Sequence, residues 1–159
     1  MTIQVGDTIP SALLACMQDG IQSLSTTELF AGKKVLLFSV PGAFTPTCSA
    51  QHLPGYVEHA AAFRSKGVDL VACMSVNDVF VMDAWGQSQN VGDSVMMLAD
   101  GNGDFARTLG MEMDASAFGM GHRGQRFALI VEDGKVTALQ LEGPGEFKVS
   151  SAEAMLAEL

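Results

Sequence analysis

A cysteine in a short loop with two prolines has the clearest chemical potential in the sequence. Cys48 lies within residues 41–49 (PGAFTPTCS), directly after an apolar run at 35–40 that predicts a buried strand. In α/β proteins, ligands bind where strand ends face a helix N-terminus. There, free backbone N–H groups and the helix dipole stabilise a thiolate, the nucleophilic form of cysteine. The loop therefore predicts thiol chemistry at Cys48, with Thr45 or Thr47 able to cap the following helix. The alternative is a small buried structural cysteine.

The apolar patterning predicts the elements that position this loop. Short apolar runs indicate five strands, at residues 35–40, 68–74, 95–99, 127–131 and 136–141, the last two joined by a glycine-containing turn at 132–135. Helical patterns indicate three helices, at residues 56–66, 79–89 and 150–159; Asp78 and Ser151 are expected to cap the starts of the last two. This order favours a single α/β domain over residues 1–159, with a central mixed sheet flanked by helices.

Composition excludes several classes of protein. The 159 residues are 48% hydrophobic, which excludes disorder, and carry a net charge of −9, which argues against nucleic-acid or membrane-surface binding. No apolar stretch is long enough to span a membrane, and the first ten residues do not resemble a secretory signal. The three cysteines are widely spaced, which predicts a reducing cytoplasm. They form no metal-binding pattern with the three histidines, so we expect neither metal nor cofactor.

The loop sequence resembles the peroxidatic-cysteine motif of the peroxiredoxins. In that motif a Pro, three residues, a Thr or Ser, two residues and a Cys follow one another, which matches Pro41, Thr45 and Cys48. The sequence around the motif, including residues 52–55 (HLPG), is similar to that of the type II, peroxiredoxin-5-like subgroup. Segments farther along, such as VACMSVND and QRF, are also similar, so the resemblance extends from about residue 5 to the C-terminus.

The resemblance implies a thioredoxin-like fold and a thiol-dependent peroxidase that reduces hydrogen peroxide and organic hydroperoxides. Cys48 would attack the peroxide as a thiolate and become a sulfenic acid. Thr45 would donate its hydroxyl to the peroxide, Arg126 would stabilise thiolate and transition-state charge, and Pro41 would shield the sulfur. The implied pocket residues are Phe118, Gly42 and Thr47. As alternatives, Arg126 could form a surface ion pair, Thr45 could be only a cap, and Phe118 could belong to the core.

The remaining cysteines bear on how the enzyme is recycled. Cys73 matches a candidate resolving cysteine of the subgroup, but its apolar strand context equally fits a small buried residue. The stretch 147–151 lacks the C-terminal cysteine of animal-type members, and Cys16 matches no catalytic position. We therefore expect glutathione with glutaredoxin, or thioredoxin, as the reductant. The resemblance further implies a homodimer.

Weaker signals leave other possibilities open. His52 lies four residues after Cys48 and could act as a base, although Pro54 should disturb a helix there and a structural hydrogen bond fits better. The glycine-rich segment 101–106 formally fits a dinucleotide motif, but flanking aspartates favour a turn before a short helix. The competing functions are thioredoxin-like thiol–disulfide exchange and a non-enzymatic chaperone or binding module.

Overall fold

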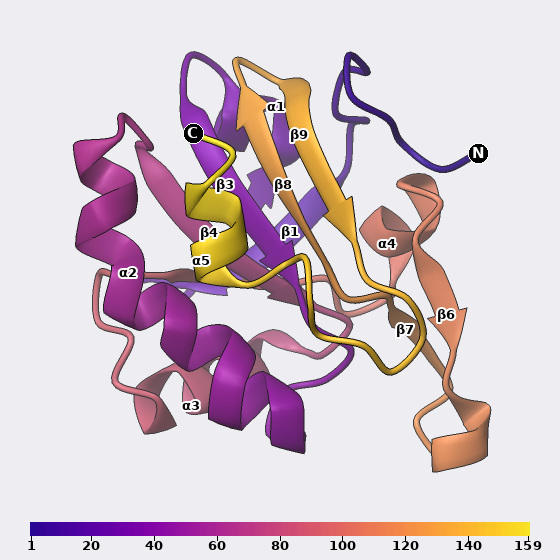
Figure 1. Cartoon of the computed structure of the whole chain (residues 1–159). Coiled ribbons are helices and arrows are strands. Elements are labelled where there is room, and N and C mark those ends of the chain that lie inside the picture. Colours follow the sequence, from indigo (N-terminus) through magenta and orange to yellow (C-terminus); the bar gives the residue numbers. More distant parts are fainter.

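A seven-stranded mixed sheet runs through the middle of the computed structural model, which describes residues 1–159 (Figure 1). The strand order is β2-β1-β5-β4-β3-β8-β9; β3, β4 and β5 are mutually parallel, and all other neighbours are antiparallel. The strands span β1 Leu13–Met17, β2 Ile21–Ser25, β3 Lys34–Ser39, β4 Leu70–Ser75, β5 Met96–Ala99, β8 Phe127–Glu132 and β9 Lys135–Leu141.

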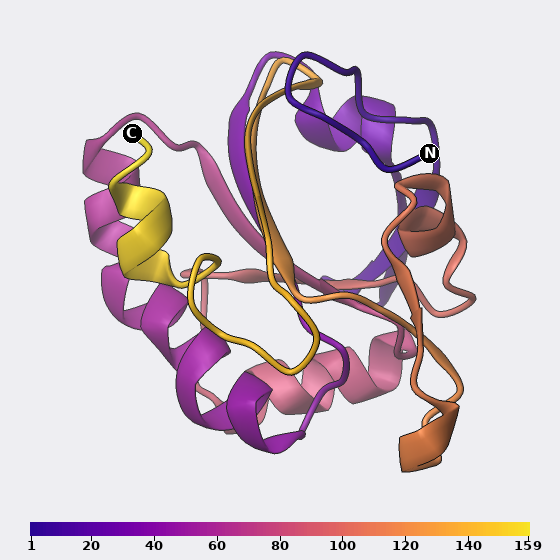
Figure 2. The same ribbon diagram turned by 45° about the vertical axis from the view of Figure 1, so that its right-hand side comes forward.

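Helices cover both faces of this sheet (Figure 2). One face carries α2 (Leu53–Ser65), α3 (Val79–Ser88) and α5 (Ala152–Leu156), and the other carries α1 (Thr26–Phe30) and α4 (Asp104–Thr108). Successive residues of β3 alternate between the two hydrophobic cores: Leu36 packs toward the α2 side and Leu37 toward the α1 side. Because both faces are buried, β3 is apolar almost throughout, and the expected α/β layering around a mixed sheet is confirmed.

The predicted strands and helices are present, with shifts of a few residues at their ends. Asp78 caps α3 by accepting from the Val81 N–H (2.8 Å), and Ser151 caps α5 in the same way. The turn between β8 and β9 has positive φ at both Asp133 and Gly134, as a two-residue hairpin requires. The segment at 101–106 is the expected turn leading into the short α4.

Several elements differ from the sequence prediction. The helix expected to begin at residue 56 begins at Leu53, because Pro54 lies in its first turn, where a missing N–H breaks no hydrogen bond. The β1–β2 hairpin and α1 were not predicted, since β2 is largely exposed and carries no clear alternation. A second sheet, β6 (Glu112–Asp114) paired with β7 (His122–Gly124), was also missed, and the 3₁₀ helix η2 (Ser116–Phe118) lies at its tip (Figure 1).

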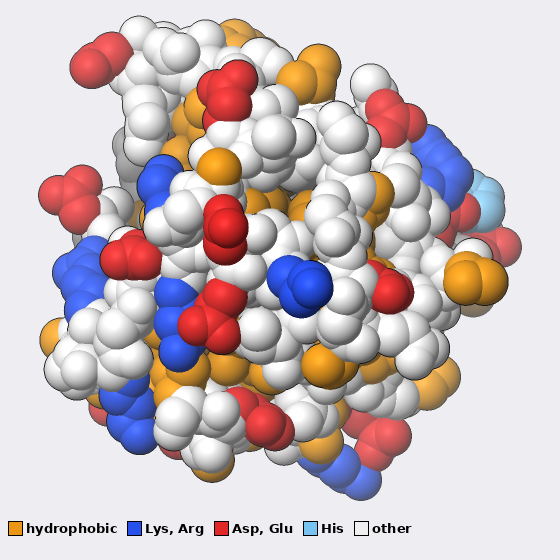
Figure 3. All heavy atoms as spheres, turned by 90° about the horizontal axis from the view of Figure 1, so that it is seen from above, with side chains coloured by type: hydrophobic (Ala, Val, Ile, Leu, Met, Phe, Trp, Pro, Cys, Tyr) orange, Lys and Arg blue, Asp and Glu red, His pale blue; other side chains and the backbone are white.

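Charges are dispersed over the molecular surface seen from above, where acidic and basic side chains alternate without a large patch of either sign (Figure 3). None of the helices combines the length and the apolar character that crossing a membrane requires.

Candidate active site

The loop that follows β3 is tied to the end of β4 by Asn77. The Asn77 side-chain oxygen accepts from the Ala43 N–H (3.0 Å) and from the Ser75 hydroxyl (2.7 Å). Within the loop, Thr45 donates its hydroxyl to the Gly42 carbonyl at 2.7 Å. The loop is therefore fixed to the carboxyl ends of two neighbouring parallel strands, the edge at which α/β proteins bind their ligands.

Gly42 is required by close packing against the β6–β7 sheet. A Cβ at this position would lie 3.0 Å from Met120 Cε and 3.4 Å from an Arg123 nitrogen. Arg123 in turn donates to the carbonyls of Val76 (3.1 Å) and Met120 (2.9 Å), and so joins the sheet to the loop after β4. A Cβ at position 42 would also lie 3.2 Å from the Thr45 methyl group, so a side chain there would force small shifts in these neighbours.

Cys48 begins a π-helical segment, η1 (Cys48–His52), that runs directly into α2, and its side chain is fully buried. The expected threonine cap is wrong: Thr47 makes no side-chain cap bond, and the Thr45 hydroxyl is engaged by Gly42 instead. Thr47 also has helical backbone angles (φ −65°, ψ −39°), whereas a capping residue is extended. Ser49, the next residue, accepts a hydrogen bond from the Trp85 indole at 3.0 Å, which fixes the helix start to α3.

Arg126 contacts the Cys48 sulfur although the two residues are far apart in the sequence. It directly precedes β8, which pairs with β3, so the sheet brings together residues 78 positions apart. One guanidinium nitrogen donates to Cys48 Sγ at 3.1 Å, and the other donates to His52 Nδ1 at 2.8 Å. The structure therefore places Arg126 beside the thiol rather than in a surface ion pair.

His52 is buried and serves as a hydrogen-bond partner of Arg126. Its Nε2 donates to the Ser150 carbonyl at 3.0 Å, which leaves Nδ1 free to accept from the guanidinium. Burial, together with the Arg126 charge, lowers the pKa of His52 to about 3. Both ring nitrogens are thus engaged in a neutral imidazole, the structural hydrogen bond that the sequence favoured over a base.

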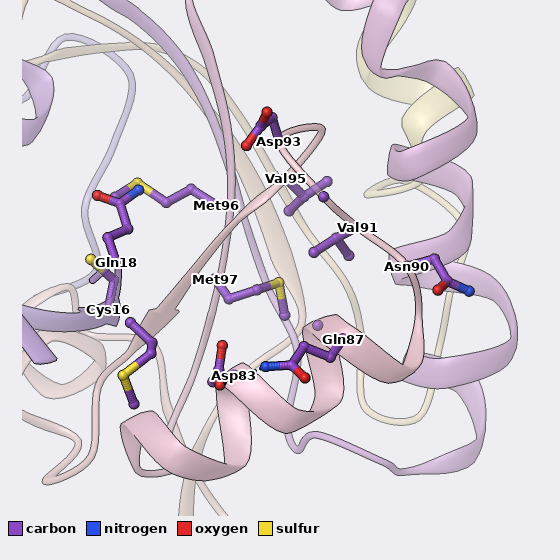
Figure 4. Close-up of a pocket in the computed structure, with 13 residues that line it drawn as sticks. Cys16, Gln18, Asp83, Gln87, Asn90, Val91, Asp93, Val95, Met96 and Met97 are labelled. Carbon is purple, nitrogen blue, oxygen red and sulfur yellow. Dashed lines mark hydrogen bonds between the residues drawn. The ribbon is translucent and has the colours of Figure 1, made fainter. Parts of the chain in front are cut away.

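The other two cysteines lie in apolar surroundings. Cys73 is fully buried on β4, where burial, and less so the neighbouring Cys48, raises the pKa of its thiol well above the usual range. Cys16 lies on β1, and burial also raises the pKa of its thiol. It borders a cavity of about 260 Å³ between β1, α3 and β5, which is lined by polar side chains and methionines and by neither Cys48 nor Arg126 (Figure 4). All three cysteines are free.

The remaining predicted site residues differ in their surroundings. Pro41 and Thr47 are half-buried in the loop around Cys48, and Gly42 is buried. Phe118 lies on η2 with 79% of its surface exposed, so it does not belong to the core.

The structure also brings in residues that sequence reasoning did not identify. The Ser150 carbonyl accepts from His52 and from the Tyr56 hydroxyl, and the Phe147 ring lies beneath the Arg126 guanidinium, 5.8 Å away. The sequence signals near them are the helix start predicted at residue 150 and the turn-forming stretch Gly143–Gly145 after the last strand. That stretch predicts a change of direction but not its destination.

Comparison with known proteins identifies close relatives. The family model described as Redoxin matches residues 4–156. The chain is 51% identical over 164 residues to Peroxiredoxin-2E-2, chloroplastic, of Oryza sativa subsp. japonica, covering 99% of the chain and 73% of that protein. It is 47% identical to Peroxiredoxin-2E, chloroplastic, of Arabidopsis thaliana, covering 99% of the chain and 70% of that protein. The reduced Prx3 of Vibrio vulnificus in complex with H₂O₂ is 52% identical, with a TM-score of 0.95 and 99% of both chains covered.

The expected cytoplasmic location is contradicted by these relatives. Both plant proteins are named chloroplastic and match nearly the whole chain, its cysteine loop included. Three widely spaced free cysteines indicate surroundings that keep thiols reduced, which more than one compartment provides. The step from cysteine pattern to cytoplasm was therefore wrong.

The buried histidine predicts a specific pH dependence of stability. Unfolded His52 takes up a proton below about pH 6.5, whereas the folded residue stays neutral down to about pH 3. The free energy of unfolding should therefore fall as the pH decreases through this window, by up to about 1.4 kcal/mol per pH unit from this residue. Urea unfolding between pH 5 and 7 should give a shallower pH slope for His52→Gln than for wild type. The exposed His122→Gln is the control, and equal slopes for His52→Gln and wild type would contradict the prediction.

Proposed function

The chain belongs to the redoxin family and, within it, to the type II peroxiredoxins, and we propose that Cys48 and Arg126 carry out the chemistry of its thiol-dependent peroxidase activity. The family reduces peroxides with a cysteine thiolate, and neither simple thiol–disulfide exchange nor a non-enzymatic module is favoured. The observation that carries the assignment is the 3.1 Å contact between the Arg126 guanidinium and the Cys48 sulfur. Neither of the other two thiols has such a partner.

In the proposed reaction, the Cys48 thiolate attacks one oxygen of hydrogen peroxide or an organic hydroperoxide. An S–O bond forms as the O–O bond breaks, and the leaving oxygen takes a proton to become water or an alcohol. The sulfur loses two electrons and becomes a sulfenic acid, while the peroxide is reduced. This chemistry needs an activated nucleophile and charge stabilisation, and neither requires a metal or a cofactor. That the enzyme works without a metal or a cofactor stays a prediction.

Arg126 would supply the charge stabilisation. Negative charge moves from sulfur to the leaving oxygen during O–O cleavage, and a fixed guanidinium can follow it without reorganising. Because the Cys48 side chain is buried, water screens this interaction weakly, which strengthens it.

The loop residues would shape the peroxide pocket. Thr45 lies three residues before Cys48, and its hydroxyl can turn from the Gly42 carbonyl to a bound peroxide oxygen. Pro41 and Thr47 would limit the approach of water from either side. Gly42 would leave room for the small substrate beside Thr45, since a Cβ at position 42 would lie 3.2 Å from the Thr45 methyl group.

Substitution of the two central residues tests this assignment. Cys48→Ser should abolish peroxide consumption in stopped-flow assays. Arg126→Gln should lower the second-order rate by about 10²–10³-fold, as for other removed transition-state donors. Arg64→Gln, which removes an exposed cation of α2, is the matched control and should react like wild type. A wild-type rate no faster than that of free cysteine, or equal rates for wild type and Cys48→Ser, would overturn the assignment.

Recycling would use an external thiol. A first thiol would attack the sulfenic sulfur and release water, and a second would resolve the mixed disulfide and regenerate the Cys48 thiolate. We infer glutathione with glutaredoxin, or thioredoxin, as the source of these thiols. The alternative, a disulfide with Cys73, requires the buried β4 thiol to become accessible, and burial keeps that thiol protonated. It would therefore need local unfolding around η1.

Mass spectrometry after one equivalent of peroxide separates the two cycles. We expect a persistent sulfenic acid on Cys48, trapped by dimedone, or a glutathione adduct when glutathione is present. Cys73→Ser should leave both products and the glutathione-dependent turnover unchanged, because Cys73 is buried in the sheet. Cys16→Ser is the control. A Cys48–Cys73 disulfide in wild type would contradict the external-thiol route.

A homodimer is the oligomeric state that we propose. Three large aromatic side chains are exposed: Phe44 in the cysteine loop (55%), Phe80 in the first turn of α3 (64%) and Phe118 on η2 (79%). The start of α2, α3 and η2 all lie along the lower end of the molecule in both views (Figures 1 and 2). Exposed apolar groups gathered at one end are typical of an association surface. A second copy would cover them beside the Cys48 loop, where Phe118 could act as a pocket wall.

Light scattering coupled to size exclusion tests the dimer. Wild type should elute with the mass of two chains, and Phe80→Asp should shift it toward one chain by placing a charge in the interface. Leu13→Asp alters an equally exposed apolar residue on β1 and should remain dimeric. A wild-type mass of one chain at every concentration would refute the proposal.

The whole chain would act as one domain over residues 1–159. This is supported by the family match over residues 4–156 and by the sheet, which combines strands from both halves of the sequence.

A further inference from the structure

We propose that Glu142 is a positioning residue for the Arg126 guanidinium. It would act by shaping the segment 147–150, which holds both Arg126 and His52 in place. This inference rests on the role proposed above for Arg126 at the Cys48 sulfur, and it adds a group that touches neither the sulfur nor the substrate.

Glu142 follows β9 directly, and its carboxylate is bound by three backbone N–H groups and one hydroxyl. It is 5% exposed and accepts from the consecutive N–H groups of Lys148, Val149 and Ser150 at 2.8–2.9 Å, and from the Ser150 hydroxyl at 2.7 Å. Successive N–H groups of this kind form an anion-binding concavity. The Lys148 ammonium pairs with Glu146 instead. The buried charge of Glu142 therefore fixes the path of the segment.

The pKa of Glu142 agrees with this description. Burial alone would raise it, but the hydrogen bonds from Lys148, Val149 and Ser150 bring the pKa below its usual value. The carboxylate is therefore charged at neutral pH and accepts all of these donors at once.

The segment that Glu142 holds supplies two supports for the active site. The Ser150 carbonyl accepts from His52 Nε2 (3.0 Å) and from the Tyr56 hydroxyl (2.7 Å). The Phe147 ring packs 4.9 Å from the His52 ring and 5.8 Å from the Arg126 guanidinium carbon. Displacement of the segment would remove the carbonyl and the ring together.

The Ser150 carbonyl also determines which nitrogen of His52 faces Arg126. Because the carbonyl can only accept, Nε2 must carry the proton, and Nδ1 presents its lone pair to the guanidinium at 2.8 Å. That bond orients the guanidinium so that its other nitrogen reaches Cys48 Sγ. The Glu142 N–H further donates to the Arg126 carbonyl at 3.0 Å, so both residues are fixed at the same end of the β8–β9 pair.

A double-mutant cycle on the rate of Cys48 oxidation by hydrogen peroxide tests the proposal. Glu142→Gln replaces an acceptor oxygen with an amide that faces backbone donors, and the rate should fall by about ten- to a hundredfold, the scale of a misplaced catalytic group. In an Arg126→Gln background the same substitution should change the rate by no more than about twofold, because the group on which it acts is absent. Glu146→Gln alters a half-buried carboxylate of the same loop that pairs with the Lys148 ammonium rather than with the backbone N–H groups of residues 148–150, and as the matched control it should react like wild type.

The outcomes separate this proposal from the proposed function. If Arg126→Gln reacts as fast as wild type, the role of Arg126 is wrong and the role of Glu142 is wrong with it. If Arg126→Gln is slow but Glu142→Gln has the same effect in both backgrounds, Glu142 only stabilises the fold and the positioning role is overturned. Circular dichroism and thermal melting check folding. Should Glu142→Gln not fold, Ser150→Ala removes one of the carboxylate's hydrogen bonds and can replace it in the same double-mutant cycle. We then expect a smaller loss of rate in the wild-type background. A Ser150→Ala rate equal to that of wild type would overturn the proposal.

Discussion

The contact between the Arg126 guanidinium and the Cys48 sulfur is the interaction on which the rest of the site depends. The Cys48 sulfur is fully buried, so the thiolate that we propose would lack hydration, and the guanidinium at 3.1 Å would replace part of that solvation. The contact also makes Cys48 differ from Cys73. Both thiols are buried and near one another, but burial dominates at Cys73 and holds it in the protonated form.

Sheet topology makes this contact possible. Strand β8 pairs antiparallel with β3, and Ser39 at the end of β3 is aligned with Phe127 at the start of β8. Consequently the chain leaving β3 and the residue entering β8 meet at one edge of the sheet. A register slip of one residue would turn the side chains of β8 to the opposite face. The two cores, which share alternate residues of β3 and β8, therefore also determine the position of Arg126.

Sequence reasoning succeeded where the determining interactions are local. The buried strands, the Asp78 and Ser151 caps and the 132–135 turn depend on neighbours within a few residues, and all are present. The motif also pointed to Cys48 and Arg126, which the structure brings together. The threonine cap failed because the Thr47 backbone is already helical (φ −65°, ψ −39°), whereas a capping residue is extended. The hydrogen bond between His52 and the Ser150 carbonyl joins residues 98 positions apart. Neither the residue types nor their spacing in the sequence predicts this bond.

The way Arg126 is held explains why its charge remains available to the sulfur. Arginine side chains are commonly fixed by carboxylates. A carboxylate about 4 Å from the guanidinium would attract it with about 4 kcal/mol at an effective dielectric constant of 20, and its negative charge would oppose a thiolate beside the same guanidinium. Here the guanidinium rests on the neutral His52, whose pKa of about 3 keeps it uncharged, and on the Phe147 ring. The Glu142 carboxylate accepts from backbone N–H groups of residues 148–150 and makes no ion pair with Arg126. Under the proposed roles, the site would use a carboxylate to fix geometry without neutralising the cation that stabilises the thiolate.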